Sequence, residues 1–292
     1  MGNNKNVNLD HFKNLLIFVT QLILRYIMNR NFIFAPFVFC LMLNVQAFGQ
    51  SENGFVKKSH LMAGGGVLLY NILMPENFDA SKKYPLVLFL HGAGERGNDN
   101  EKQLIHGSKM FLEPANRKDF SSIVVFPQCP QGESWGNVKA DRSKNPLSFS
   151  FNYDAPSTPA MELVMDLLNN LIMEGNVDTR RVYVMGLSMG GFGTFEMVYR
   201  QPDLFAAAAP ICGGGDDIRY DTRVKKTVFW VFHGDADPVV HVDLSRIMVK
   251  KLESLKGKVK YTEYPGVGHN SWDHAFAEKE FLSWMFSQKR KK

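Results

Sequence analysis

The stretch that most constrains this chain runs from Val182 to Phe195 and reads VYVMGLSMGGFGTF. An apolar run enters the segment Gly186-Leu187-Ser188-Met189-Gly190, and small or apolar residues at helical spacing follow to about Arg200. This order predicts a strand, a sharp turn and a helix, with the serine hydroxyl held clear of the backbone at the carboxyl edge of a sheet. The two glycines of the segment lack the Cβ atoms that would collide in such a turn.

Ser188 needs support from elsewhere in the chain, because the pattern G-x-S-x-G arises by chance in about one chain in ten of this length. The alternative is a glycine-rich turn that only packs tightly. Support comes from two later loops, each directly after an expected strand, of which the first is an apolar run that indicates a buried strand. Residues 227–232 lead into His233-Gly234-Asp235-Ala236-Asp237, and residues 259–264 lead into a glycine-hinged loop with His269. Serine, acid and histidine therefore follow in the order that this kind of nucleophile uses.

These residue types supply the chemistry of nucleophilic catalysis. A serine hydroxyl is a poor nucleophile near neutral pH, so His269 would take the proton of Ser188 during attack and return it to the leaving group. A buried carboxylate would hold the imidazole and stabilise its charged form. Asp235 and Asp237 are both candidates for that carboxylate. His274 is the fallback for His269, although its place within an expected helix favours a surface or capping role.

An oxyanion intermediate needs backbone N–H donors beside the nucleophile. One donor is expected from Met189, directly after the serine. The other is expected from Ala93 or Gly94, whose small side chains let the backbone approach substrate in the loop after the apolar run 84–90. His91 opens that loop, and we expect it to shape the loop by hydrogen bonding and not to react.

Three residues are candidates for contact with substrate. Trp135 lies in a glycine-flanked segment of the long irregular stretch 127–156, where it either stacks on a sugar ring or an aromatic acyl group or packs the loop onto the core. Glu95 and Arg96 follow the oxyanion loop and either bind a polar end of the substrate or pair with each other. Both alternatives stay open for each of them.

The remaining pattern predicts an α/β fold. Two strand-like runs, 55–62 and 67–74, flank a cluster of glycines and indicate an antiparallel hairpin at the edge of the sheet. From residue 84 onward, apolar strands alternate with helical stretches, which indicates a mostly parallel sheet with helices on both faces. The expected strands are 84–90, 123–126, 182–185, 205–211, 227–232 and 259–264, and the expected helices are 158–175, 189–200, 242–255 and 271–286.

Length and charge restrict the classes of protein to which the chain can belong. Its 292 residues, 45% of them hydrophobic, suffice for one large core, so we expect a single domain over residues 50–287 and a basic tail over 288–292. Four of the 34 basic residues and one of the 29 acidic residues lie in residues 1–49, so the net charge of +5 falls to +2 (30 basic, 28 acidic) without them. Nucleic-acid binding therefore has no support from charge.

The amino terminus has the pattern of a secretory signal peptide over residues 28–49. From Met28, a polar basic start precedes the apolar run 32–45, and small residues come before Gln50. We expect cleavage near Gly49-Gln50, export to the periplasm or the medium, and residues 1–27 to be an upstream extension. A retained membrane anchor is the alternative, but this run of 14 residues falls short of the about 20 that span a bilayer. We therefore expect no stable membrane span after cleavage.

Two cysteines, Cys129 and Cys212, lie outside the expected signal peptide. In an exported protein such a pair invites a disulfide. The strands that lead to them should be separated by two others, with neighbouring strands about 4.8 Å apart, whereas bridged Cα atoms lie within about 7 Å. We expect two free, buried thiols.

Several segments together resemble the serine esterase branch of the α/β-hydrolases. They are LFLHGAGERGNDNEKQLIHG, VVFPQCPQGESW, GLSMGGFGTFEMVYRQPDLFAAAAPICGG, HGDADPVV and GVGH. The pattern is similar to that of bacterial exported phospholipase/carboxylesterase-like and feruloyl-esterase-like carbohydrate esterases, and it covers about residues 55–286. The H-G-x-x-D-x-x-V pattern of these hydrolases places the acid on Asp237, which leaves Asp235 as a turn residue whose carboxylate accepts hydrogen bonds from nearby N–H groups.

The resemblance implies an α/β-hydrolase fold without a large cap domain, and ester hydrolysis through an acyl-enzyme with no cofactor and no metal. The implied substrate is a small acyl or aryl ester or an ester linked to a polysaccharide, and the oligomeric state stays open. A serine peptidase of the same fold is one alternative, although oligopeptidases of this fold usually carry a propeller domain. A non-catalytic carbohydrate-binding scaffold is the other, but a complete set of serine, acid and histidine argues against it.

Overall fold

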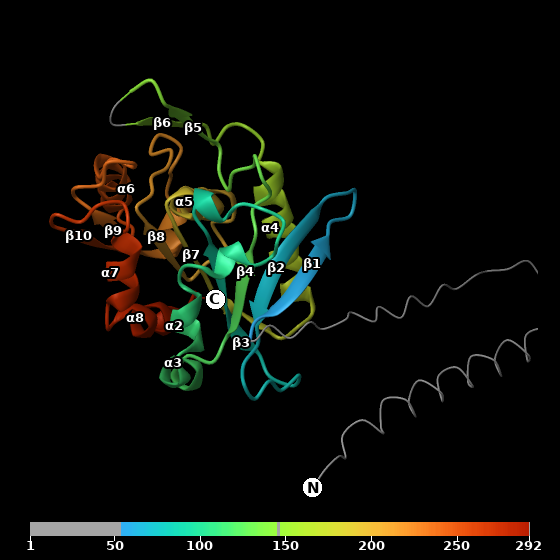
Figure 1. Cartoon of the computed structure of the whole chain (residues 1–292). Helices are drawn as coiled ribbons and strands as arrows, with labels where there is room; N and C mark the ends of the chain where they lie inside the picture. Colours follow the sequence, from blue (N-terminus) through green and yellow to red (C-terminus); the bar gives the residue numbers. More distant parts are fainter. Residues whose placement is uncertain (1–53, 145–146, 292) are drawn as a thin grey trace, which may run out of the picture. The chain divides into compact units, whose positions relative to one another are not determined.

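The computed structural model describes residues 54–144 and 147–291 (Figure 1). The expected upstream extension, signal peptide and cleavage site at 1–50 lie outside the described residues. Within the described part, no helix combines the length and the apolar character needed to cross a membrane.

An eight-stranded sheet forms the centre of the molecule, with the strand order β1-β2-β4-β3-β7-β8-β9-β10 (Figure 1). β1 pairs with β2 and β2 with β4 in antiparallel fashion, and all other neighbours are parallel. The mostly parallel sheet and the antiparallel hairpin at its edge are therefore confirmed. The strands are β1 (Val56–Leu61), β2 (Val67–Leu73), β3 (Tyr84–Leu90), β4 (Ile123–Pro127), β7 (Val177–Leu187), β8 (Ala207–Ile211), β9 (Val228–Gly234) and β10 (Val259–Tyr264).

Helices cover both faces of this sheet, which explains why the central strands carry almost unbroken apolar sequence. Every residue of β3 is buried, because its alternate side chains enter two different core clusters. One cluster contains side chains of α4 (Pro159–Met173), α5 (Met189–Arg200) and α6 (Asp243–Ser254). The opposite cluster contains side chains of α2 (Ser108–Leu112), α7 (Ser271–Ala277) and α8 (Phe281–Ser287), while α3 (Pro114–Asp119) follows α2.

The start and end of α4 follow from local sequence. The Thr158 hydroxyl accepts a hydrogen bond from the Met161 N–H at 3.2 Å, and Pro159 occupies the first helical position. Gly175, at φ +93°, takes the left-handed conformation that ends the segment just after the helix. The expected boundaries of this helix are confirmed.

The expectation of one closing helix over 271–286 is wrong, because the chain forms α7 and α8 with a break between them. Glu278 takes an extended conformation, φ −62° and ψ 115°, and this interrupts the helical hydrogen bonds. The break lets α8 turn Phe281 onto Trp230 and Phe232 of β9, with ring centroids at 6.0 and 5.4 Å. Packing against the sheet overrides the helical pattern of the sequence.

The stretch 127–156, expected to be irregular, contains a second sheet. β5 (Val138–Asp141) and β6 (Ser148–Phe151) pair as an antiparallel hairpin, which Figure 1 shows at the top of the view, away from the main sheet. The segment between β3 and β4 also contains the short helices α2 and α3, for which the sequence analysis had no prediction. The alternating Ser-Phe-Ser-Phe of β6 was the signal for a strand that could have been used.

Cys129 and Cys212 are both free and buried. Cys129 follows β4 and Cys212 follows β8, and β3 and β7 lie between these strands. The prediction of two separate thiols is confirmed.

Candidate active site

Ser188 lies in the turn between β7 and α5, with φ 53° and ψ −115°. A non-glycine residue in this region is strained, and the surroundings must hold it there. The Ser188 N–H donates to the carbonyl of Ile211 at 2.9 Å, and its carbonyl accepts from the Phe192 N–H at 3.0 Å. These two bonds fix the backbone of Ser188 between β8 and the first turn of α5.

The glycines around Ser188 are required by close backbone contacts. A Cβ atom on Gly190 would lie 1.9 Å from the carbonyl oxygen of Leu90, and one on Gly186 would lie 2.5 Å from the carbonyl oxygen of Gly190. Neither neighbour is a flexible side chain that could move aside. The steric role predicted for both glycines is therefore confirmed.

Ser188, His269 and Asp237 form a continuous hydrogen-bonded chain. The Ser188 Oγ lies 2.9 Å from Nε2 of His269, and Nδ1 of His269 lies 2.7 Å from Oδ2 of Asp237. A neutral imidazole with its proton on Nδ1 satisfies both contacts. The Asp237 side chain is fully buried, whereas 21% of the His269 side chain is exposed. Three loops, after β7, β9 and β10, thus bring the three predicted residues together.

The carboxylate of Asp237 is held by several N–H groups. Its Oδ1 accepts from the backbone N–H groups of Val239 and Val240 at 2.8 and 2.9 Å. Desolvation of the buried carboxylate would raise its pKa, but hydrogen bonds from His233 and His269 and the neighbouring backbone N–H outweigh it and hold the pKa of Asp237 well below its usual range. The group is therefore an anion at any pH at which the protein would work.

His233 is a residue of this site that the sequence analysis missed. Its side chain is fully buried, and its Nε2 lies 3.3 Å from Oδ2 of Asp237 and 2.8 Å from the carbonyl of Val240. Its Nδ1 lies 2.7 Å from the hydroxyl of Ser245 on α6. His233 thus joins the acid loop to α6. The signal available in the sequence was its position directly before Gly234, at the end of an apolar strand.

The competing candidates lie elsewhere. Asp235 is exposed and accepts a hydrogen bond from the Gly266 N–H at 2.6 Å, as expected of a turn residue. His274 is an exposed residue of α7 whose ring faces Tyr264 at a centroid distance of 5.2 Å. Neither residue belongs to the hydrogen-bonded chain of Ser188.

His91 shapes the loop after β3, as predicted. Its Nδ1 lies 2.6 Å from the carbonyl of Gly92, and its Nε2 accepts from the Cys129 N–H at 2.9 Å, so the ring is held as one neutral tautomer. Burial lowers the pKa of His91 to about 4. The ring is therefore neutral wherever the protein would be active, and it connects the loop to the end of β4.

The expected oxyanion donors lie on two segments, the start of α5 and the loop after β3. Met189 opens α5, where the first N–H groups have no partner within the helix. Ala93 and Gly94 lie in the 3₁₀ turn η1 (Ala93–Glu95), both exposed, and no atom lies within 4 Å of the position that a Cβ of Gly94 would take. This loop adjoins the nucleophile turn, since a Cβ on Gly92 would lie 2.8 Å from the side chain of Leu187.

Of the two alternatives for Trp135, stacking on substrate is wrong and packing onto the core is confirmed. The residue is 0% exposed, and its indole N–H donates to the carbonyl of His91 at 3.0 Å. A Cβ on Gly193 would lie 2.5 Å from the Cβ of Trp135. Trp135 can therefore pack closely against α5 because residue 193 is a glycine. No face of the ring is left for a ligand.

Glu95 and Arg96 do not pair with each other in the described part of the chain. The Glu95 side chain is mostly buried, 3.8 Å from Nε2 of His106 and 4.0 Å from Nδ1 of His91. Arg96 lies beside Cys129. Burial raises the pKa of the Cys129 thiol to about 12, although the charge of Arg96 and a hydrogen bond from it act in the opposite direction. Of the two alternatives for these residues, the mutual ion pair is therefore wrong, and contact of Glu95 and Arg96 with a substrate stays a prediction.

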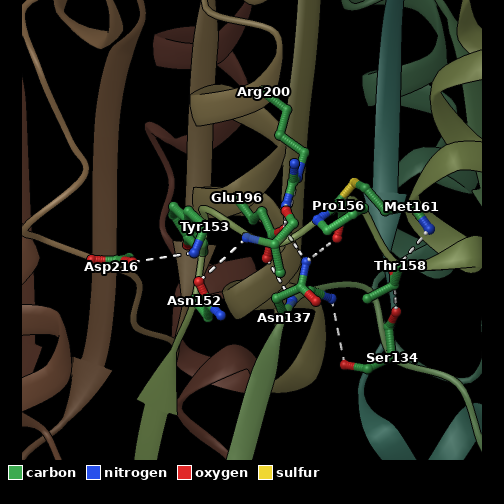
Figure 2. Close-up of polar contacts among 12 residues, drawn as sticks. Ser134, Asn137, Asn152, Tyr153, Pro156, Thr158, Met161, Glu196, Arg200 and Asp216 are labelled. Atoms are coloured by element: carbon green, nitrogen blue, oxygen red, sulfur yellow. Dashed lines mark hydrogen bonds and ion pairs between the residues drawn. The ribbon is translucent and has the colours of Figure 1, made fainter.

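A buried ionic network fastens the stretch 132–156 to α5 (Figure 2). Glu196 is 1% exposed and accepts from Nε of Arg200 at 2.7 Å, from the Asn137 N–H at 2.6 Å and from the Asn137 amide at 3.0 Å. Arg200 also donates to the carbonyl of Ala155 at 2.9 Å. One turn of α5 closer to the serine, Phe192 packs against Phe149 of β6, with ring centroids at 5.1 Å. The hairpin is thus anchored along the helix that follows the nucleophile.

One group of side chains in the described residues has the spacing of metal ligands, namely Cys212, Asp237 and His269, whose ligand atoms lie within 4.8 Å of one another. The Nδ1 atom of His269 is already bonded to Asp237. Burial raises the pKa of the Cys212 thiol far above its ordinary value, so the sulfur stays protonated and is a poor ligand. We therefore interpret this cluster as two residues of the hydrogen-bonded chain, Asp237 and His269, with a protonated cysteine beside them.

Comparison with known proteins places these features in a family. The chain matches the phospholipase/carboxylesterase family over residues 78–285. It is 26% identical over 205 residues to acyl-protein thioesterase 1 of Neurospora crassa, which covers 63% of this chain and 80% of the relative. It is also 26% identical over 157 residues to the bifunctional acetylxylan esterase/xylanase XynS20E of Neocallimastix patriciarum, covering 54% of this chain and 20% of that protein.

Among solved structures, the chain is similar to a thermostable esterase at 38% sequence identity and a TM-score of 0.74. The match covers 81% of this chain and 64% of that one, so the chain spans less than two thirds of the esterase.

Proposed function

The chain belongs to the phospholipase/carboxylesterase family of α/β-hydrolases, and from this membership we propose that it cleaves carboxylic esters through an acyl-enzyme on Ser188. The observation that carries the proposal is the hydrogen-bonded chain from the Ser188 Oγ through His269 to the buried carboxylate of Asp237. Carboxylic esters of small acyl or aryl groups, free or linked to carbohydrate, are the proposed substrates.

The proposed reaction has two symmetrical halves. The Ser188 Oγ attacks the ester carbonyl carbon while Nε2 of His269 takes the hydroxyl proton, and the carbonyl oxygen becomes an oxyanion facing the N–H groups of Met189 and of Ala93 or Gly94. The carbon–oxygen bond of the ester then breaks, and His269 gives its proton to the departing alcohol. A water molecule repeats these steps on the acyl-serine and releases the acid and free Ser188. These steps consume only ester and water.

Asp237 supports both halves electrostatically. Its hydrogen bond to Nδ1 keeps Nε2 of His269 free to accept the serine proton. Because the carboxylate is buried and anionic, it stabilises the imidazolium that forms at each transfer. Its role is to orient and stabilise His269, and it holds no proton at any step.

The proposal is tested by covalent labelling combined with kinetics. A fluorophosphonate should modify the wild-type protein at Ser188 and fail to modify Ser188→Ala, while the exposed Ser283→Ala serves as control. On 4-nitrophenyl acetate, Ser188→Ala and His269→Ala should each lower kcat by about 10⁴- to 10⁶-fold, and the double variant should lose little more because the two groups act as a unit.

The same assay separates the alternatives. A protein that is not labelled and hydrolyses no ester would be a non-catalytic scaffold. A protein that is labelled and hydrolyses a peptidyl anilide, which an esterase leaves intact, would be a peptidase. Labelling of a different serine would contradict the proposed nucleophile.

We also propose that the protein is exported after cleavage near Gly49-Gln50. The support is the polar start, the apolar run 32–45 and the small residues before Gln50. Amino-terminal sequencing of protein isolated from its native cells tests this. A start at or beside Gln50 is expected, and an intact terminus upstream of Met28 on protein inside the cell would contradict it.

A further inference from the structure

The loop after β3, residues 91–100, contains the expected oxyanion donors but no large apolar side chain, since it reads HGAGERGNDN. Ala93 and Gly94 are exposed, and within η1 only Glu95 is buried. Apolar packing therefore contributes little to the position of this loop. A backbone N–H that stabilises an oxyanion must nevertheless be held to within about 0.5 Å of its working position. Hydrogen bonds have to supply that precision.

The residue directly after β4 supplies several of these hydrogen bonds. The side chain of Gln128 is buried, and its Nε2 donates to the carbonyl of Glu95 at 3.2 Å and to Oδ1 of Asp99 at 2.9 Å. Its Oε1 accepts from the Asn100 N–H at 2.7 Å. The backbone N–H of Gln128 donates to the carbonyl of Leu69 in β2 at 2.8 Å. One amide side chain thus connects three residues of the loop to the sheet.

Cys129 holds the same loop at two more residues. Its N–H donates to Nε2 of His91 at 2.9 Å, and its carbonyl accepts from the Gly97 N–H at 3.1 Å. A Cβ on Gly97 would lie 3.1 Å from Nε2 of Gln128, so the loop backbone packs directly on that side chain. Two consecutive residues after β4 are therefore hydrogen-bonded to the loop along most of its length.

A cluster of buried amides fixes the far end of the loop. Asn100 has φ 55°, and Nδ2 of Asn71 in β2 donates to its carbonyl at 2.9 Å and to its Oδ1 at 3.1 Å. Within the described part of the chain, Oδ1 of Asn71 and Oε1 of Gln103 are buried without a hydrogen-bond partner. Unpaired buried acceptors lower the stability of a fold. The cluster is thus a poor source of stability, and what it supplies is a defined position for the loop.

We propose that Gln128 is a positioning residue for ester cleavage. Its hydrogen bond fixes the carbonyl of Glu95, and Ala93, Gly94 and Glu95 form a single 3₁₀ turn. Fixing that carbonyl therefore fixes the N–H of Ala93 or Gly94 where it can donate to the oxyanion. Because its side chain is buried, Gln128 acts through the loop and not on the substrate. This inference rests on the proposed ester hydrolysis and adds the residue that sets the position of one oxyanion donor.

The test uses Gln128→Met, which keeps the length of the side chain and removes its hydrogen bonds. Both halves of the reaction pass through an oxyanion, so kcat on 4-nitrophenyl acetate should fall about 10- to 100-fold while KM changes by less than about threefold. A trifluoromethyl ketone gives a second measurement, because its adduct with Ser188 is itself a tetrahedral oxyanion. Its Ki should rise by about the factor by which kcat falls.

Two further variants complete the design. Thr227→Val is the matched control, since the buried hydroxyl of Thr227 donates to the carbonyl of Phe205 at 3.1 Å at the start of β9, the opposite end of that strand from His233. It should lower stability but keep kcat and Ki within about twofold. Asn100→Gly permits the left-handed backbone and removes the side chain that Asn71 and Gln103 contact. It should lower kcat and raise Ki by about three- to tenfold, and it decides the question if circular dichroism shows that the variant at 128 does not fold.

The possible outcomes are distinct. An unchanged kcat in Gln128→Met would overturn the inference, and so would a lower kcat with an unchanged Ki. Equal losses in Thr227→Val would also overturn it, because activity would then follow stability alone. If the wild-type protein does not hydrolyse the ester and takes up no fluorophosphonate, the proposed esterase function fails. A failure of the inference about Gln128 alone leaves the wild-type protein active and labelled.

Discussion

Asp235 and Asp237 lie two residues apart in one loop, yet their surroundings give them different properties. Asp237 is buried, accepts hydrogen bonds from two backbone N–H groups and is hydrogen-bonded to His269. Asp235 is exposed and accepts one N–H from the loop that carries His269. Only the first can hold an imidazole in a desolvated site, where a charge acts more strongly than in water.

We expect Asp237→Asn to lower kcat/KM on 4-nitrophenyl acetate by about 10³- to 10⁴-fold, because the amide removes the charge that stabilises the imidazolium. Asp235→Asn keeps the shape of the side chain and should cost less than about tenfold. Initial-rate kinetics of both variants, made in parallel, measure the difference. If Asp235→Asn proved the more damaging change, the assignment of the acid would be wrong.

His91 links the stability of the fold to pH. Its pKa of about 4 in the native protein lies below its ordinary value of 6.5, because burial disfavours the charged ring. Between these values the unfolded chain binds a proton that the native protein does not. The contribution is therefore fully present above pH 6.5 and is lost as the pH falls toward 4, by an amount on the order of 3 kcal/mol.

The matching prediction uses His91→Gln. This variant loses the hydrogen bonds of the ring and should be less stable at neutral pH, but its free energy of unfolding should fall less steeply between about pH 6.5 and 4.5 than that of the wild type. Urea unfolding at several pH values measures both slopes. All other titrating groups are common to the two proteins, so parallel slopes would contradict the buried neutral state of His91.

At the scale of elements, the hairpin of β5 and β6 has no place in the main sheet and depends on α5 for its position. Glu196 and Arg200 form a buried pair on that helix, and Asn137 at the base of the hairpin completes the network. Removing one partner of a buried ion pair leaves the other charge without compensation. The network should therefore control both the stability of the fold and the order of the hairpin.

Glu196→Ala should lower the free energy of unfolding by about 3 to 5 kcal/mol, because Arg200 is left with 14% of its side chain exposed and no carboxylate. Hydrogen exchange should increase over residues 132–156 before it increases in the central strands. Glu253→Ala, at an exposed position near the end of α6, is the control and should change stability by less than about 0.5 kcal/mol. Equal effects of the two substitutions would show that the network contributes nothing.

At the scale of the whole molecule, the sheet separates the two thiols and buries both of them. Burial raises the pKa of Cys129 to about 12 and that of Cys212 further, so neither forms the reactive thiolate near neutral pH. Reaction with a thiol reagent therefore requires unfolding of the core.

We expect iodoacetamide at about pH 8 to leave Cys129 and Cys212 unmodified in the native protein and to modify both in concentrated urea. Peptide mapping by mass spectrometry identifies each site without reduction, and it would also detect a disulfide. Rapid modification of either residue in the native protein would contradict the buried state of that residue.

Much of this architecture is determined by the sequence, because the physical rules involved act over a few residues. A Cβ on Gly186 would meet the carbonyl oxygen of Gly190 within the same turn, so the spacing of these glycines around Ser188 predicts the turn itself. Thr158 and Pro159 determine where α4 begins, and an apolar run as continuous as 84–90 needs cover on both faces of a sheet. The succession of serine, acid and histidine along the chain can also be read directly from the sequence.

Other features depend on contacts between distant segments, and only the tertiary structure decides them. Trp135 lies in the stretch 127–156 and Trp272 lies in the first turn of α7, and no local pattern states which of the two side chains is buried. The first is buried because α5 offers a glycine at its face, and the second remains partly open because α7 turns it toward His269. The hydrogen bonds of His233 and the break between α7 and α8 also depend on contacts between segments that are distant in the sequence. Exposure and partners are properties of the packed molecule, which local periodicity does not encode.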